Sequence, residues 1–127
     1  MRIDLSHSEL FLRDDGIVQV NTTDHDYGMK ELKEINIAQG QLNNGKRRLL
    51  LVIVSEFANI EKEGREYMAT DESTQFSIVE AYVISSLAHK ILGNFYMRMN
   101  KPSVPTRFFT EIKVAEEWLN TYRPSDL

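Results

Sequence analysis

The chain has 127 residues, 42% of them hydrophobic and 27% charged, which predicts a single domain, residues 1–127, with an ordinary hydrophobic core. It contains no cysteine, so disulfides, thiolate metal sites and cysteine nucleophiles are excluded. The net charge of −4 argues against general nucleic-acid binding. No apolar run reaches the roughly eighteen residues of a membrane span, and the N-terminus lacks a signal-peptide core, so a cytoplasmic protein without a transmembrane segment is expected.

Two short strands and a helix are predicted in the first third of the chain. Residues 9–13 and 17–21 flank Asp14-Asp15-Gly16, a strong hairpin-turn signal. A helix then begins near Tyr27, with Asp24 or Asp26 as its cap, and ends at Asn43-Asn44-Gly45. Its apolar face is expected to comprise Met29, Leu32, Ile35, Ala38 and Leu42.

The middle of the chain predicts strand, helix and strand. Residues 49–54 form an unbroken apolar run, which is typical of a central strand covered on both faces. A helix follows at about residues 60–69, and a strand at residues 77–84. Gly64 lies inside that helix, where glycine costs about 1 kcal/mol relative to alanine, so we expect it to answer a need for close backbone packing.

The last third predicts two more helices. Ser85 or Ser86 caps a helix that runs to about Asn100, and a short strand covers residues 107–109. Along this helix one apolar stripe comprises Leu87, Ile91, Phe95 and Met99, with Ala88, Leu92 and Tyr96 beside it. The stripe either packs between the sheet and its neighbours or receives a partner or a second copy of the chain. Thr110 is expected to cap a final helix that buries Val114, Ala115, Trp118 and Leu119.

The elements follow the order β-β-α-β-α-β-α-β-α. Strands that alternate with helices imply right-handed crossovers and a parallel sheet. The opening hairpin adds an antiparallel edge. The predicted fold is therefore α/β, with a mixed, mostly parallel sheet and an N-terminal β-hairpin.

This order, from "DDGIVQV" to "FFTEIKVAEEWL", resembles the STAS domain of anti-sigma-factor antagonists and their SpoIIAA-like relatives, an uncharacterised bacterial branch in particular. The C-terminal half carries the most specific part of the resemblance, a Phe-Thr step before an "A..WL" helix. The resemblance implies a SpoIIAA-like fold and a regulatory protein–protein interaction. Some relatives are described as STAS/SEC14-like, which implies a small lipophilic ligand as an alternative.

The resemblance also implies a comparison at the helix that follows the central strand. Antagonists open that helix with Asp-Ser-Ser-Gly and are phosphorylated on a serine. Here Glu61 falls on the aspartate, Lys62 and Glu63 on the serines, and Gly64 on the glycine. The turn has no hydroxyl to accept a phosphate, so no phosphorylation is expected between residues 61 and 64.

Catalytic and metal-binding patterns are weak. Glu61 and Glu63 lie two apart on a helix and point to different sides, so they suit a helix start better than an acid–base pair. Asp24-His25-Asp26 could chelate a metal but lacks a third partner, and capping by aspartate explains the same residues. His89 is expected to face solvent. No nucleophile elbow, P-loop or dinucleotide signature occurs, and we predict no enzyme activity, cofactor or metal site.

The sequence therefore predicts a non-catalytic regulatory or interaction module that binds an unknown protein partner and that could be a homodimer. Its partner surface is expected on the helix after the central strand and the loop before it, through Glu56, Asn59, Glu61, Lys62, Glu63, Gly64 and Tyr67, together with parts of the residue 87–99 helix. The alternative is a binder of a small lipophilic molecule, with an apolar pocket lined by Tyr82, Phe95 and Phe109.

Overall fold

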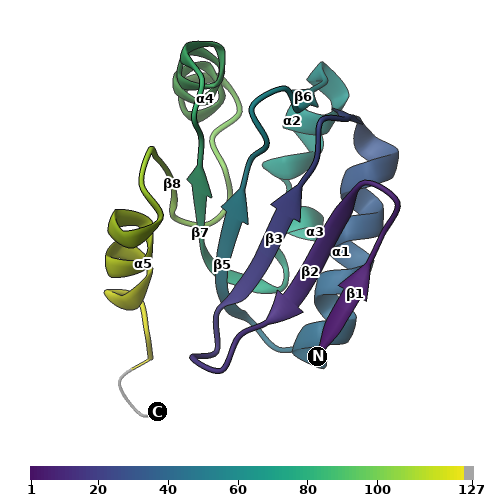
Figure 1. Cartoon of the computed structure of the whole chain (residues 1–127), viewed down its shortest axis with the longest axis vertical. Helices are drawn as coiled ribbons and strands as arrows, with labels where there is room; N and C mark the ends of the chain where they lie inside the picture. The colour runs from purple at the N-terminus through teal and green to yellow at the C-terminus, as the bar shows by residue number, and fades with distance from the viewer. Residues whose placement is uncertain (125–127) are drawn as a thin grey trace.

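A computed structural model describes residues 1–124 and contains a central sheet of six strands (Figure 1). Its order is β1-β2-β3-β5-β7-β8, and the two pairings among β1, β2 and β3 are antiparallel. The other three pairings are parallel, so the sheet is mixed and mostly parallel, as predicted. The strands are β1 (Arg2–Asp4), β2 (Ser8–Leu12), β3 (Val18–Thr22), β5 (Arg48–Ile53), β7 (Ser77–Val83) and β8 (Thr106–Phe109).

Helices cover the two faces of this sheet unequally. The structure has α1 (Met29–Asn43), α2 (Lys62–Met68), α3 (Asp71–Thr74), α4 (Leu87–Met99) and α5 (Ile112–Asn120). The first three lie behind the strands in Figure 1, and α4 lies beyond the upper end of β7. Helices α1 to α4 lie in the connections between the parallel strands β3, β5, β7 and β8, and they cover one face of the sheet. Helix α5 packs against β5, β7 and β8 on the other face. None of the helices within residues 1–124 is long and apolar enough to cross a membrane.

The central strand β5 is apolar throughout because both of its faces are covered. Leu50 and Val52 join Tyr82 and Tyr96 in the core under α1, α2 and α4. Leu49 and Leu51 join the core under α5, with Ala115 and Leu119. Alternate side chains of a strand point to opposite faces, so a strand buried on both faces loses the alternating pattern.

Helix α5 covers one face of the sheet at β5, β7 and β8, and on the same face the side chains of β2 and β3 are polar. Glu9, Gln19 and Asn21 are half-buried there. The Gln19 amide donates to Asn21 Oδ1 at 2.9 Å, and the Asn21 amide donates to Glu9 Oε1 at 2.8 Å. This cross-strand polar row explains why apolar and polar residues alternate along β3.

Local turn and cap signals confirm several predictions. Gly16 closes the hairpin with a φ of 86°, and Asn44 and Gly45 end α1 with φ values of 53° and 75°. These left-handed conformations favour glycine and asparagine. Ser86 caps α4, because its Oγ accepts a hydrogen bond from His89 N at 3.0 Å.

Other local predictions were incomplete or wrong. The sequence did not predict β1, the short α3, or the two-stranded parallel sheet of β4 (Asp26–Tyr27) and β6 (Asn59–Ile60). Gly28, rather than Asp24 or Asp26, is the N-cap of α1, and Glu31 Oε1 accepts from Gly28 N at 3.0 Å. Asp26 cannot fill that role, because its backbone belongs to β4.

Three further differences concern helix ends and exposure. Glu111 rather than Thr110 is the N-cap of α5. Met29 at the start of α1 is 42% exposed, and Val114 in α5 is 44% exposed, although both were expected to be buried. Each lies in the first turn of its helix.

Candidate functional site

A cavity of about 90 Å³ lies between the sheet and helices α1, α2 and α4. Its floor is the face of β3, β5 and β7 that α1, α2 and α4 cover, and this floor includes Leu50 and Val52. Helix α4 closes it with the side that carries His89, Gly93 and Tyr96. Most of the lining is apolar, as in small-molecule sites, so the few polar groups inside decide what the cavity can bind.

Three aromatic rings form the wall beneath α4. Tyr82 stacks on Phe108 with ring centroids 5.1 Å apart, and the Tyr96 ring meets Phe108 edge-on at 6.2 Å. Gly93 allows this approach, because a Cβ at that position would lie 3.1 Å from the Phe108 ring. The glycine therefore lets α4 lie close over the aromatic wall.

Glu80 is the most unusual residue in the cavity, a carboxyl group only 3% exposed in the middle of an apolar strand. Ser77 Oγ donates to one of its oxygens at 2.8 Å and Tyr82 Oη donates to the other at 2.9 Å. Burial raises the pKa of Glu80, and the two hydrogen bonds oppose that shift. Burial, followed by the nearby Glu80 charge, raises the pKa of Tyr82 and of Tyr96 as well.

Polar groups from α1 support the same cluster. Gln39 is 2% exposed, and its amide donates to Ser77 Oγ at 3.0 Å and to the Phe76 carbonyl at 3.3 Å. Asn36 is 8% exposed and donates to Tyr67 Oη at 3.3 Å. The inward side of α1 is thus partly polar, which its hydrophobic periodicity did not indicate.

Three polar atoms of the cavity lining are buried without a hydrogen-bond partner in the described structure: Asn36 Oδ1, His89 Nδ1 and Tyr96 Oη. Buried polar atoms are nearly always paired, because an unpaired one costs about 1–3 kcal/mol. Their concentration at one cavity marks it as the leading candidate binding site.

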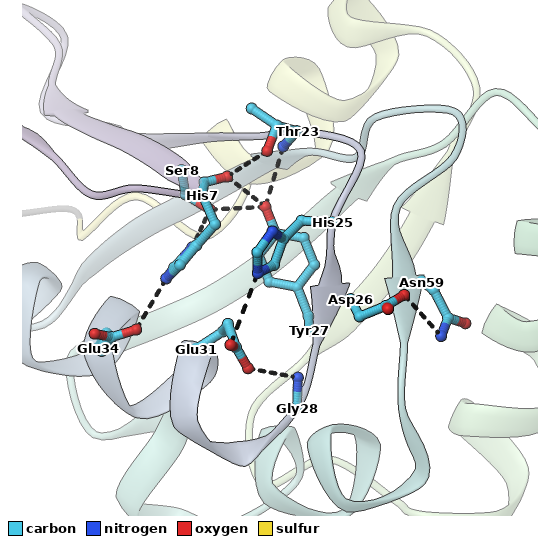
Figure 2. A network of polar contacts seen from close by, with 10 residues as sticks. All are labelled: His7, Ser8, Thr23, His25, Asp26, Tyr27, Gly28, Glu31, Glu34 and Asn59. Carbon is cyan, nitrogen blue, oxygen red and sulfur yellow. Dashed lines mark hydrogen bonds and ion pairs between the residues drawn. The ribbon is translucent and has the colours of Figure 1, made fainter.

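A second buried polar cluster lies around Tyr27 at the start of α1, and its contacts are complete (Figure 2). Tyr27 Oη donates to the His7 carbonyl at 2.6 Å, accepts from Thr23 N at 3.0 Å and contacts Ser8 Oγ at 2.9 Å. His7 Nδ1 contacts Ser8 Oγ at 2.9 Å, and its Nε2 contacts a Glu34 oxygen at 3.1 Å.

This Tyr27 cluster contains a serine, a histidine and a glutamate, yet its geometry is that of a structural tie. Ser8 and His7 are 3% and 2% exposed, so no substrate can approach the hydroxyl. The hydroxyl is also shared with Tyr27. The cluster fastens the β1–β2 connection to β4 and α1. No sequence pattern indicated it, because His7 stands alone in the chain.

The Asp24-His25-Asp26 segment does not gather its side chains at one point. Asp24 accepts from Ser55 Oγ and, at 3.1 Å, from Phe57 N, whereas Asp26 accepts from Asn59 at 3.4 Å. His25 turns toward Glu31, with 3.7 Å between Nε2 and Oε2 (Figure 2). Among residues 1–124 no three His, Asp or Glu side chains are grouped to hold a metal ion.

The seven residues expected to bind a partner divide into two groups. Glu56, Asn59, Glu61, Lys62 and Glu63 are exposed on α2 and the segment before it. Gly64 and Tyr67 are buried, so they were wrongly assigned to a surface. A Cβ on Gly64 would lie 2.7 Å from the Tyr27 carbonyl oxygen, which confirms the expected close approach to a neighbouring backbone.

The three residues expected to line an apolar pocket do not meet. Tyr82 lines the cavity, but Phe95 is 41% exposed on α4, and Phe109 lies in the core on the opposite side of the sheet. Phe108 takes the expected place of Phe109, because neighbouring residues of β8 point to opposite faces. The register of this four-residue strand could not be derived from two adjacent phenylalanines.

The orientation of α4 decides between the two alternatives that the sequence left open for its apolar stripe. Its stripe of Leu87, Ile91, Phe95 and Met99 is exposed, by 73%, 63%, 41% and 64% respectively. His89, expected in solvent, is 7% exposed, and its Nε2 lies 2.7 Å from the Ala58 carbonyl oxygen. The helix thus has one side in the cavity and an apolar side in solvent.

These features define a small α/β protein with a mixed sheet, a cavity under α4 and an apolar exposed helix. A family model described as a domain of unknown function, DUF7793, matches residues 10–123, and the chain belongs to that family. Comparison with curated proteins finds no match, and comparison with solved structures finds none either.

Proposed function

We propose that this chain is a non-catalytic regulatory or protein–protein interaction module of the SpoIIAA-like type, and that its partner binds on α4. The observation that carries the proposal is the exposed stripe of Leu87, Ile91, Phe95 and Met99, here named the α4 surface. Successive members are four residues apart, so they lie along one side of the helix. A contiguous exposed apolar patch of this kind marks interaction sites in proteins.

The α4 surface continues toward the segment that the STAS resemblance favours. The Arg65 guanidinium of α2 lies over the Phe95 ring, 5.8 Å from its centroid. His89 holds the Ala58 carbonyl oxygen, next to Phe57, which is 73% exposed. A partner seated on α4 would therefore also reach Phe57 and the exposed residues before α2.

Charge favours an acidic partner. The segment Leu87–Met99 contains Lys90 and Arg98 and no acidic residue, although the chain as a whole has a net charge of −4. A second copy of the chain would set these cations against each other, whereas an amphipathic helix with acidic flanks would pair with them. The proposed partner is therefore a different protein that presents such a helix. With no hydroxyl in residues 61–64, its binding would not depend on a phosphate at the start of α2.

The test uses two synthetic amphipathic peptides with the same leucine positions, one flanked by glutamates and one by lysines. Fluorescence anisotropy should show that the acidic peptide binds and the basic peptide does not. Ile91→Ser should weaken binding roughly tenfold. Ile37→Ser is the matched control, because Ile37 is 62% exposed and Ile91 is 63% exposed.

Three outcomes would contradict the proposal. Equal binding of both peptides would show that Lys90 and Arg98 do not select an acidic partner. A dimer in light scattering that Ile91→Ser dissociates would assign the α4 surface to a second copy. Binding to phosphatidylserine vesicles that Ile91→Ser abolishes would assign it to a membrane.

A further inference from the structure

The cavity under α4 carries an inference that does not depend on the proposed partner. We propose that it is a binding site for a small amphiphile headed by an uncharged group that both donates and accepts hydrogen bonds, of which an alcohol is the simplest. The inner side of α4 lines this cavity, whereas the α4 surface faces outward. The two sites therefore share one helix and can be tested separately.

The unpartnered atoms define the hydrogen bonds that the ligand must make. His89 Nε2 contacts a carbonyl oxygen, which can only accept, so Nε2 carries a proton and, in the neutral ring, Nδ1 is an acceptor. Asn36 Oδ1 is also an acceptor, whereas the Tyr96 hydroxyl has a proton to donate. A hydroxyl head pairs with both kinds of group, because it can accept from the Tyr96 hydroxyl and donate its one proton to one of the two acceptors.

The charge state of the cavity excludes a strongly charged head. Both oxygens of Glu80 accept hydrogen bonds, and no ion pair with a cation involves this carboxyl in residues 1–124. An anionic head would need the Arg65 guanidinium of the lining as its counter-charge, but that group already donates to the Ile60 carbonyl oxygen at 2.7 Å. A cationic head would need Glu80 as its counter-charge, but both oxygens of that carboxyl already accept hydrogen bonds from Ser77 and Tyr82.

Size and surroundings define the tail. The cavity of about 90 Å³ is smaller than the roughly 150 Å³ that hold a benzene molecule in an engineered cavity. Its walls are Leu50, Val52, Leu92 and the rings of Tyr82 and Phe108. A short hydrocarbon chain matches both the volume and the apolar lining.

The test compares three probes of equal length: butan-1-ol, butylammonium and butyrate. The protein is labelled with carbon-13 on its methionine methyl groups and titrated by NMR. Met68 lines the cavity, whereas Met97 and Met99 are exposed on α4, so the methyl signals distinguish the cavity from the outer surface. Butan-1-ol should shift the Met68 signal saturably and leave the Met97 and Met99 signals in place. Butylammonium and butyrate should shift the Met68 signal at least tenfold less at the same concentration.

Tyr96→Phe tests the hydrogen bond of the head group, since it removes the unpartnered hydroxyl and keeps the ring. We expect butan-1-ol to bind about three- to tenfold more weakly to this variant. Tyr122→Phe, at a residue 37% exposed on the surface, should change nothing.

Several outcomes would overturn the inference. A Met68 signal that does not shift with butan-1-ol would show that the cavity takes water only. Shifts that are equal for the alcohol and the charged probes, or a Tyr96→Phe variant with unchanged affinity, would show that the polar atoms do not select the head. Shifts confined to Met97 and Met99 would assign binding to the outer side of α4. The peptide titration of the α4 surface can succeed or fail independently of each result.

Discussion

Two polar clusters buried within residues 1–124 differ in their hydrogen bonds: the cluster around Tyr27 has all of its contacts, whereas the cluster around Glu80 does not. Around Tyr27, the hydroxyl, the His7 carbonyl and the Thr23 amide satisfy one another. Around Glu80, the carboxyl is satisfied, but within residues 1–124 the Tyr96 hydroxyl and Asn36 Oδ1 in the same cavity lining are not. A complete cluster stabilises a fold, whereas an incomplete one lowers stability and persists where it serves a function.

The largest effect should come from breaking the complete cluster with Tyr27→Phe. The change removes one hydroxyl that joins His7, Ser8 and Thr23, and it leaves the Thr23 amide without its acceptor. We expect the free energy of unfolding to fall by about 2–3 kcal/mol. Urea denaturation measures it, with Tyr122→Phe as the control. A loss below about 0.5 kcal/mol would contradict a structural role for the cluster.

A smaller loss should follow from Gly64→Ala, which acts on the same tyrosine from its backbone side. The added Cβ would lie 2.7 Å from the Tyr27 carbonyl oxygen, a backbone atom that cannot move aside alone. Overpacking costs about 1–3 kcal/mol, and alanine returns about 1 kcal/mol of helix propensity. The difference between these two effects is a net loss of up to about 2 kcal/mol, expected in the same urea measurement.

The matched substitution is Gly45→Ala, at a glycine with open space around it but a φ of 75°. This variant should lose about 1 kcal/mol of unfolding free energy, and backbone strain alone should cause the loss. If Gly64→Ala were instead stabilising, α2 would not need its close approach to Tyr27.

The incomplete cluster should show itself through pH dependence. Burial raises the pKa of Glu80 in the folded protein, so the folded state holds this proton to a higher pH than the unfolded state does. The contribution of Glu80 to stability is therefore fully present below about pH 4.5, its unfolded pKa, and is lost as pH rises through the folded pKa.

Glu80→Gln should remove the loss of stability at high pH, because glutamine carries no titrating group. The amide can still pair with the Ser77 and Tyr82 hydroxyls, since a hydroxyl can either donate or accept. The stability of the variant relative to the native chain should be unchanged near pH 4 and should rise toward pH 8. Thermal unfolding at a series of pH values measures the difference, with Glu66→Gln on the exposed side of α2 as the control. A difference that does not vary with pH would mean that Glu80 is solvated.

The elements of the fold were largely predictable, because hydrophobic periodicity and turn residues are local. The run at residues 49–54 and the signals at Gly16 and Asn44 gave β5, the hairpin and the end of α1. The strands β4 and β6 were not predictable, since each has two residues and forms only when segments about thirty residues apart meet.

The candidate site was less predictable, because it depends on how helices are turned. Periodicity finds an apolar stripe on α4 but cannot say whether that stripe faces the sheet. Packing on Phe108 requires Gly93, which turns Tyr96 and His89 inward and Ile91 outward. One signal was available: Glu80 interrupts the apolar run of β7, and a charged residue in a buried strand marks a special site.

The smallest effect, and the sharpest test of the comparison, should come from Tyr96→Phe. Tyr96 and Tyr82 are both buried, and both rings contact Phe108. The Tyr82 hydroxyl donates to the Glu80 carboxyl, whereas the Tyr96 hydroxyl has no hydrogen-bond partner in the described part of the chain. Tyr82→Phe should therefore cost about 1 kcal/mol, whereas Tyr96→Phe should raise the free energy of unfolding by up to about 1 kcal/mol. Urea denaturation measures the change in the free energy of unfolding, and its sign, for both variants. If Tyr96→Phe destabilised the protein as much as Tyr82→Phe, the Tyr96 hydroxyl would be part of the fold. A gain in stability together with weaker binding of the alcohol would place this hydroxyl among the groups kept for a ligand.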